Sequence, residues 1–173
     1  MISSDQDIYA PCSRPTKSWT KSADSNPACL TGKDLPEEYC LNVRRWRLDP
    51  EYNKPQNLFY GFGVDIQDFL DYHQRHQLPR PPRTKRQDFL WLSIMDAVTA
   101  DLSVHCNFKI RRMLPLCDDY DYMIIFYDSH HISIQELEDD EEEDVIRVIK
   151  ERFGDSVAQQ SPRWFFPLTM DQR

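Results

Sequence analysis

Asp101 and His105 are the two residues whose types and spacing could most directly carry out chemistry. They lie four residues apart in a long apolar segment, so on a helix they share a face and the carboxylate can hold the imidazole. An imidazole held in this way can act as a general base. The alternative is structural: if the helix ends near residue 104, His105 stabilises its negative end and Asp101 pairs with solvent or a loop donor.

A second polar group, Asp128, Ser129, His130 and His131, directly follows an apolar segment with strand character. Aspartate and histidine are ligands that suit zinc or iron. However, adjacent residues of an extended chain face opposite ways, so His130 and His131 cannot readily bind one ion together. A polar hairpin turn explains the group without a metal.

Two further pairs of residues fall short of a motif. His73 and His76 are three apart in a predicted helix, but no HExxH glutamate accompanies them, and His73 lies among apolar residues that indicate packing. Gly61 and Gly63 are followed by neither a GxGxxG pattern nor a lysine of a phosphate-binding loop. We therefore predict no metal site and no cofactor.

The elements that must position these residues follow from hydrophobic periodicity. Apolar residues at helical spacing predict three main helices, which cover residues 63–78, 88–105 and 139–153. Alternating or wholly apolar segments predict strands at residues 108–113, 120–127 and 131–134, and a short edge strand interrupted by Pro167 at residues 163–168. The segment Pro79–Arg86 carries three prolines and four bases, and is predicted to be an extended connector.

This order of elements predicts an α+β fold, in which a small, mostly antiparallel sheet carries three main helices on one face. Residues 1–37 are polar, with no sustained period, and are expected to form a flexible N-terminal arm. Residues 38–173 are then expected to form a single domain of a size that can bury one core.

The acidic character of the chain is local. The net charge is −8, with 29 acids and 21 bases, but Glu136 and the run from Glu138 to Asp144 supply eight of the acids. The remaining surface is close to neutral, which makes nucleic-acid binding unlikely. The acidic run itself opens a predicted helix, where carboxylates are stabilised by the helix dipole.

The cysteines and the apolar segments bear on the cellular setting. Cys12, Cys29, Cys40, Cys106 and Cys117 form an odd set without close pairs, which favours free thiols in the cytoplasm or nucleus. No apolar segment approaches the length of a membrane span, and residues 1–10 lack the pattern of a signal peptide. If a signal peptide had been removed, Cys12, Cys29 and Cys40 could be bridged.

Several segments together resemble small uncharacterised single-domain proteins of fungi. They are GFGVDIQDFLDYHQRHQLP, the apolar helix after it, DYDYMIIFYD, and the final helix before PRWFFP. The resemblance covers about residues 58–168. It implies no activity, no substrate and no site residues.

The sequence favours a non-catalytic protein-interaction or adaptor-like domain with a protein partner and no membrane attachment. It carries no catalytic signature, but it has an acidic helix entrance, the basic proline-rich connector and a surplus of aromatics. The connector and Arg44, Arg45 and Arg47 could also form a nuclear-import or anion-binding patch, although bases in a proline-rich loop are common. The aromatics include Trp46, Tyr60, Trp91 and Trp164, and most of them are expected to lie in the core. The alternative is a small enzyme or small-molecule binder, with Asp101, His105, Asp128 and His130 as acid–base or metal groups between the central helix and the sheet.

Overall fold

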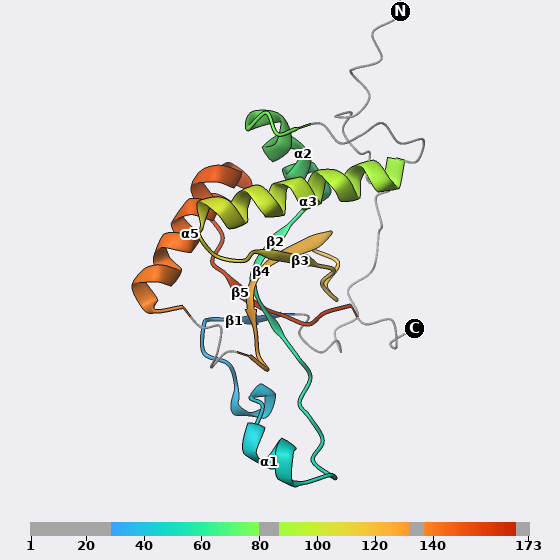
Figure 1. Ribbon diagram of the computed structural model, residues 1–173, viewed down its shortest axis with the longest axis vertical. Helices are drawn as coiled ribbons and strands as arrows, with labels where there is room; N and C mark the ends of the chain where they lie inside the picture. Colours follow the sequence, from blue (N-terminus) through green and yellow to red (C-terminus); the bar gives the residue numbers. More distant parts are fainter. Residues whose placement is uncertain (1–28, 80–86, 132–136, 169–173) are drawn as a thin grey trace, which may run out of the picture.

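A computed structural model describes residues 29–79, 87–131 and 137–168 of the chain (Figure 1). Its centre is a five-stranded sheet in the order β1-β5-β2-β4-β3, in which every neighbouring pair is antiparallel. The strands are β1 (Cys29–Thr31), β2 (Phe59–Val64), β3 (Arg111–Met113), β4 (Tyr122–Asp128) and β5 (Arg163–Phe165).

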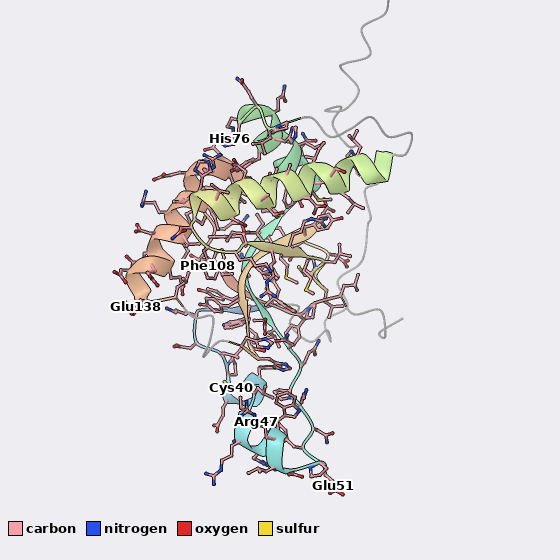
Figure 2. The ribbon with its side chains drawn as sticks, in the orientation of Figure 1. Cys40, Arg47, Glu51, His76, Phe108 and Glu138 are labelled. Carbon is pink, nitrogen blue, oxygen red and sulfur yellow. The ribbon has the colours of Figure 1, made fainter. Side chains whose placement is uncertain are left out.

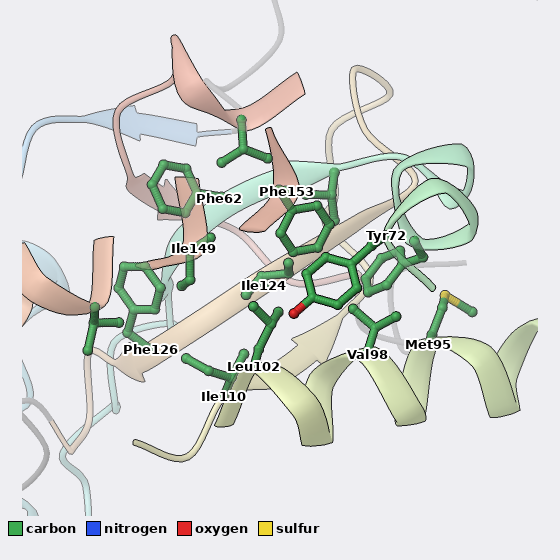
Figure 3. Close-up of a cluster of buried hydrophobic side chains, with 14 of the residues drawn as sticks. Phe62, Tyr72, Met95, Val98, Leu102, Ile110, Ile124, Phe126, Ile149 and Phe153 are labelled. Atoms are coloured by element: carbon green, nitrogen blue, oxygen red, sulfur yellow. The ribbon is translucent and has the colours of Figure 1, made fainter. Parts of the chain in front are cut away.

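Three main helices pack on one face of this sheet, which confirms the predicted α+β fold. They are α2 (Ile66–Arg75), α3 (Gln87–His105) and α5 (Asp139–Phe153), and the short α6 (Asp155–Ala158) follows α5. The core between helices and sheet contains the buried side chains drawn in Figure 3, among them Phe62, Ile124 and Phe126 from the strands and Leu102 and Ile149 from the helices. Short elements precede β2, namely a 3-10 helix (Glu37–Tyr39) and α1 (Val43–Leu48).

The predicted helices at residues 88–105 and 139–153 are confirmed, and α5 has clear boundaries in its sequence. A capping box between Glu138 and Glu141 starts α5, and Gly154, with φ of +75°, ends it. The helix predicted at residues 63–78 is shorter and begins at Ile66, after a second capping box between Asp65 and Asp68. Residues before Asp65 belong to a strand instead.

The strand β2 was not predicted, although it lies at the centre of the sheet. All six of its residues are buried, so its sequence, FYGFGV, shows no alternation between polar and apolar residues. Its two glycines are required by close contacts: a Cβ on Gly61 would lie 1.8 Å from the backbone oxygen of Ile124, and one on Gly63 would lie 2.3 Å from the ring of Tyr120. The glycines thus serve strand packing.

Two other elements differ from the sequence-based expectation. The strand at residues 163–165 is not an edge strand, since β5 lies between β1 and β2, and Pro167 falls beyond its end. The edge position is taken by β1, whose residues 29–31 fall within the segment expected to be a flexible arm. A three-residue strand in a polar context carries too little pattern to be recognised from sequence. The strand predicted at residues 131–134 lies almost wholly outside the described residues, as does the connector at residues 80–86.

The opposite face of the sheet, which we call the helix-free face, carries a second and smaller apolar cluster. Its buried members are Phe59, Cys117, Met123, Ile125 and Phe165, and Cys29 and Tyr120 pack against them. Cys117 and Tyr120 come from the loop between β3 and β4, so this loop contributes to the cover over the strands.

Candidate functional site

Asp101 lies on α3 where three helices meet. Its Oδ2 accepts hydrogen bonds from the Tyr72 hydroxyl on α2 at 2.6 Å and from Nη2 of Arg152 on α5 at 2.5 Å. Nε of Arg152 also donates to the Tyr72 hydroxyl at 2.6 Å. The predicted partner His105 is more distant, with 3.6 Å between its Nε2 and Asp101 Oδ1. The closest partners of Asp101 are therefore a tyrosine and an arginine that the spacing within α3 could not reveal.

This arrangement ties the helices together and leaves Asp101 poorly suited to orient a base. Burial alone would raise the pKa of Asp101, but the hydrogen bonds from Tyr72 and Arg152 hold that pKa below its ordinary value. Burial, reinforced by the hydrogen bond to Asp101, raises the pKa of Tyr72, which stays neutral. His105 is the last residue of α3, with its side chain 46% exposed, as the structural alternative for this pair requires.

We expect Tyr72→Phe to lower the free energy of unfolding by about 1–3 kcal/mol, because it removes the hydroxyl that donates to Asp101 and accepts from Arg152. Urea unfolding of the full chain measures the change. Tyr122→Phe is the control, since the Tyr122 ring packs edge-on against Phe69 while its hydroxyl has no hydrogen bond among the described residues. Equal stability of the two variants would contradict the role assigned to this contact.

Asp128, the last residue of β4, contacts the side chain of His131, whereas His130 reaches it only through its backbone N–H, which donates to Asp128 Oδ1 at 3.2 Å. Its Oδ1 lies 2.8 Å from His131 Nδ1, and its Oδ2 accepts from Nη2 of Arg111 at 3.3 Å. The Asp128 side chain is 4% exposed, whereas that of His131 is 56% exposed. Asp128 is thus a buried carboxylate that forms an ion pair with Arg111 and contacts the His131 ring.

His130 takes part in closing a turn. Its Nε2 lies 2.9 Å from the carbonyl oxygen of Pro55, and its backbone N–H donates to Asn57 Oδ1 at 3.2 Å. The neighbouring Ser129 hydroxyl donates to the same Asn57 oxygen at 3.1 Å and accepts from the Leu58 N–H at 2.9 Å. These contacts agree with the polar turn that the sequence suggested as an alternative to a metal site.

The four candidate residues do not converge on one site, because the sheet separates them. Asp101 and His105 belong to the helix layer. Asp128 lies directly across from Phe59, and cross-strand partners project to the same side of a sheet, so its carboxylate lies on the helix-free face. The pocket that the enzymatic alternative requires between central helix and sheet is filled by core side chains such as Leu102 and Ile124 (Figure 3).

Histidines elsewhere are also engaged in packing. His73 is buried, with Nε2 3.2 Å from the Pro79 oxygen, and Nε2 of His76 lies 3.0 Å from the oxygen of Arg152 near the end of α5. Over the described ranges, no group of three or more His, Cys, Asp or Glu side chains is placed to hold a metal ion.

Because Asp128 is buried and ionised, the free energy of unfolding should depend on pH in the acidic range. Burial alone would raise its pKa, but His131 and Arg111 lower it below the ordinary value. The ionised carboxylate therefore contributes stability that is fully present above about pH 4 and is lost as pH falls through the lowered pKa. We expect Asp128→Asn to cost about 2 kcal/mol near pH 7 and much less near pH 2, as measured by urea unfolding. A cost that does not change with pH would contradict this assignment.

The four aromatics that the sequence suggested for a binding surface, most of them expected in the core, divide sharply by exposure. Tyr60 and Trp164 are buried in the core, at 3% and 0% exposure, and Trp91 is half-buried against the core. Trp46, on α1, is 44% exposed. Trp46 is thus the most exposed of the four.

Trp46 belongs to a projection that we call the α1 lobe, residues 42–54. The lobe extends from the end of the molecule opposite α2 and α3 (Figure 1), and Figure 2 labels Arg47 and Glu51 at its tip. The helix α1 has no buried residue, and its large apolar side chains face outward: Val43 is 36% and Leu48 is 73% exposed. The apolar residues of α1 therefore do not serve the core.

Contacts within the lobe give it a defined shape. The Asn42 side chain caps α1 by accepting from the Arg45 N–H at 2.9 Å, and the Asn42 N–H donates to the Tyr52 hydroxyl at 3.2 Å. The Arg45 guanidinium lies over the Tyr52 ring at 5.2 Å, and Lys54 Nζ lies 3.7 Å from the centre of the Trp46 ring. Lys54 thus lies against one face of the Trp46 ring, and the ring remains partly exposed.

The lobe is basic, and part of its charge is unpaired. Arg45 forms an ion pair with Asp49 at 3.7 Å. Arg44 and Arg47 are exposed and form no ion pair with any residue that the structure describes. These two guanidinium groups flank Trp46 in sequence, so the lobe combines an aromatic anchor with positive charge.

Sequence reasoning identified the lobe's basic and aromatic residues, but not the element that presents them. A six-residue helix without an apolar stripe toward the core gives no periodic signal. Sequence reasoning also missed Glu142, because this residue lies within the acidic run. Its carboxylate is buried, accepts from the Tyr127 hydroxyl at 2.9 Å and pairs with Lys33 at 3.2 Å.

None of the described helices is long and apolar enough to cross a membrane. Comparison of the chain with protein-family models, with curated proteins and with solved structures finds no significant match. Function is therefore argued from the residues and their geometry.

Proposed function

We propose that this protein is a non-catalytic interaction domain that binds an acidic segment of a partner protein through the α1 lobe. The observation that supports the proposal most strongly is the outward exposure of Val43, Trp46 and Leu48 on a helix with no buried residue. A six-residue helix gains stability mainly from packing, and exposed apolar side chains gathered on one projection are typical of a contact surface.

The composition of the lobe suits a binding hot spot. Tryptophan and arginine are the residues most enriched where truncation costs binding energy. Lys54 covers one face of the Trp46 ring, so the ring loses little conformational freedom when a partner covers the other. The Trp46 side chain is therefore already ordered before a partner binds.

Charge defines the chemistry of the partner. Arg44 and Arg47 offer guanidinium groups that carboxylates can bind in a bidentate manner. An acidic segment with one large apolar side chain would satisfy both arginines and the exposed face of Trp46. The acidic run on α5 of the same molecule is partly engaged by Lys33, which pairs with Asp139 at 2.7 Å.

The direct test is an NMR titration of the isotopically labelled full chain with a synthetic peptide of alternating Glu and Asp around one leucine. We expect shifts in residues 43–54, including the Trp46 indole, and little change in α3. A peptide with Gln and Asn in place of the acids is the control. Equal shifts with both peptides, or shifts centred outside the lobe, would overturn the proposal.

Two further measurements test whether a nucleic acid or a second copy of the chain binds the lobe instead. A single-stranded oligonucleotide that shifts the lobe when the acidic peptide does not would replace a protein partner with a nucleic acid. Salt-sensitive self-association that involves the lobe, detected by sedimentation without peptide, would make a second copy the occupant.

We further propose that the protein acts in the cytoplasm or nucleus. The support is the odd number of cysteines and the free state of the four described ones, Cys29, Cys40, Cys106 and Cys117. Fractionation of cells that express the full chain tests this, and recovery from the medium would contradict it.

A further inference from the structure

We propose that Cys29 and Cys117 form a reversible dithiol–disulfide pair on the helix-free face, in which Cys29 reacts first and Arg163 supports its thiolate. The two cysteines are 88 positions apart in sequence, yet both belong to the apolar cluster of this face. This site is independent of the α1 lobe and does not rest on the proposed binding function.

The fold explains why the two thiols lie on the same face of the sheet. Cys29 is opposite Phe165 in the pairing of β1 with β5, and the Phe165 side chain lies in the helix-free cluster, so the Cys29 side chain projects to the same face. Cys117 reaches this face from the loop between β3 and β4. Both cysteines therefore pack against the same apolar cluster.

The other described cysteines are separated from this pair. Cys106 packs against the core on the helix side of the sheet. Cys40 is exposed, and its thiol lies 3.8 Å from the Leu35 oxygen and 3.7 Å from the Pro36 oxygen. Within the described part of the chain, only Cys29 and Cys117 share a cluster.

Arg163 gives the site its electrostatic character. Its Nη1 lies 3.8 Å from Cys29 Sγ, and its guanidinium lies over the Tyr120 ring at 5.8 Å. Arg163 forms no ion pair with a carboxylate anywhere in the described ranges. A half-buried guanidinium with no carboxylate partner is matched here by sulfur, and its positive charge can stabilise the negative charge that the sulfur carries during thiol–disulfide exchange.

The two cysteines differ in access, which assigns their order of reaction. Cys29 is half-buried and lies beside Arg163, whereas Cys117 is buried. Burial raises the pKa of the Cys117 thiol, and the nearby backbone N–H groups of Asp119 and Tyr120 oppose this. Cys29 therefore suits the attacking role and Cys117 the resolving role.

With glutathione disulfide as the oxidant, the chemistry is two successive thiol–disulfide exchanges. The Cys29 thiolate attacks one sulfur of glutathione disulfide, forms a mixed disulfide and expels a glutathione thiolate. The Cys117 thiolate then attacks the Cys29 sulfur, forms the intramolecular disulfide and expels the second glutathione. Two electrons pass from the protein to glutathione disulfide, and the two thiol protons end on the two glutathione molecules.

The test uses the folded full chain incubated with glutathione disulfide, quenched with acid, alkylated and mapped by mass spectrometry. We expect a Cys29–Cys117 cross-linked peptide as the main product, reversed by dithiothreitol. Cys117→Ser should accumulate the glutathione adduct at Cys29, because the resolving thiol is missing. Cys29→Ser should leave Cys117 largely unmodified.

Arg163 variants separate its charge from its packing. We expect Arg163→Gln to slow formation of the disulfide by roughly 10-fold and Arg163→Lys to restore much of the rate. Cys40→Ser and Cys106→Ser are controls that should leave the product unchanged. Cross-links dominated by other cysteines, or a folded wild-type chain whose Cys29 and Cys117 stay reduced, would overturn the proposal.

Discussion

Trp46→Ala is expected to weaken binding of the acidic peptide at least roughly 30-fold, the effect of losing a hot-spot residue worth about 2 kcal/mol. The large effect follows from geometry. The Trp46 ring is 44% exposed on the same lobe as two unpaired arginines, and Lys54 already lies against one of its faces. Isothermal titration calorimetry of the full chain measures the loss.

Two controls show whether the effect belongs to the ring. Val104→Ala removes a 77% exposed apolar side chain from α3 and should leave affinity unchanged. Because α1 has no buried residue, Trp46→Ala should also leave the urea midpoint near that of the wild type. A Trp46→Ala variant that keeps full affinity would show that the peptide binds elsewhere.

Gly61→Ala is expected to cause the largest loss of stability, about 3 kcal/mol or more. The added Cβ would lie 1.8 Å from the backbone oxygen of Ile124, and neither central strand can yield without losing its pairing. Urea unfolding measures this change. If the variant is already largely unfolded without urea, the yield of folded protein measures it instead.

Gly63→Ala provides the matched comparison within the same strand. Its Cβ would meet only the ring of Tyr120, a half-buried side chain on a loop that can move aside. The cost should therefore be clearly smaller than that of Gly61→Ala. If both variants are equally stable, the close approach of β2 and β4 at Gly61 does not limit the fold.

The contrast between α5 and β2 shows how much of the fold is predictable from sequence. The boundaries of α5 follow from local chemistry, namely a capping box at its start and a glycine at its end. The strand β2 carries no comparable signal, because both its faces are buried and its glycines are needed only where β4 and Tyr120 approach. Its pairing becomes visible only in three dimensions.

The candidate site shows the same limit. The spacing of Asp101 and His105 predicts their contact on α3, but Tyr72 and Arg152, which bind Asp101 more closely, come from helices 29 and 51 residues away. Likewise, the turn after β4 could be predicted as polar, while the choice of His131 over His130 as the partner of Asp128 depends on the turn's conformation. Long-range partners of this kind leave no pattern in a single sequence.

Exposure is a third property that sequence leaves open. Trp46 and Trp164 both lie in short segments rich in arginine and aromatic residues, yet Trp164 is fully buried and donates to the Lys33 oxygen at 2.9 Å. Trp46 differs only because its helix projects from the sheet. The proposed binding surface thus follows from the placement of α1.

A charge-reversal experiment tests the proposed function most directly. Arg44→Glu/Arg47→Glu changes two exposed arginines of the lobe, and Lys109→Glu/Arg147→Glu makes the same net change at exposed positions elsewhere. We expect the lobe variant to lose the acidic peptide and to bind a peptide with lysine in place of each acid, while the control variant keeps the wild-type preference. If both variants lose the acidic peptide equally, or the lobe variant keeps it, the α1 lobe is not the binding surface.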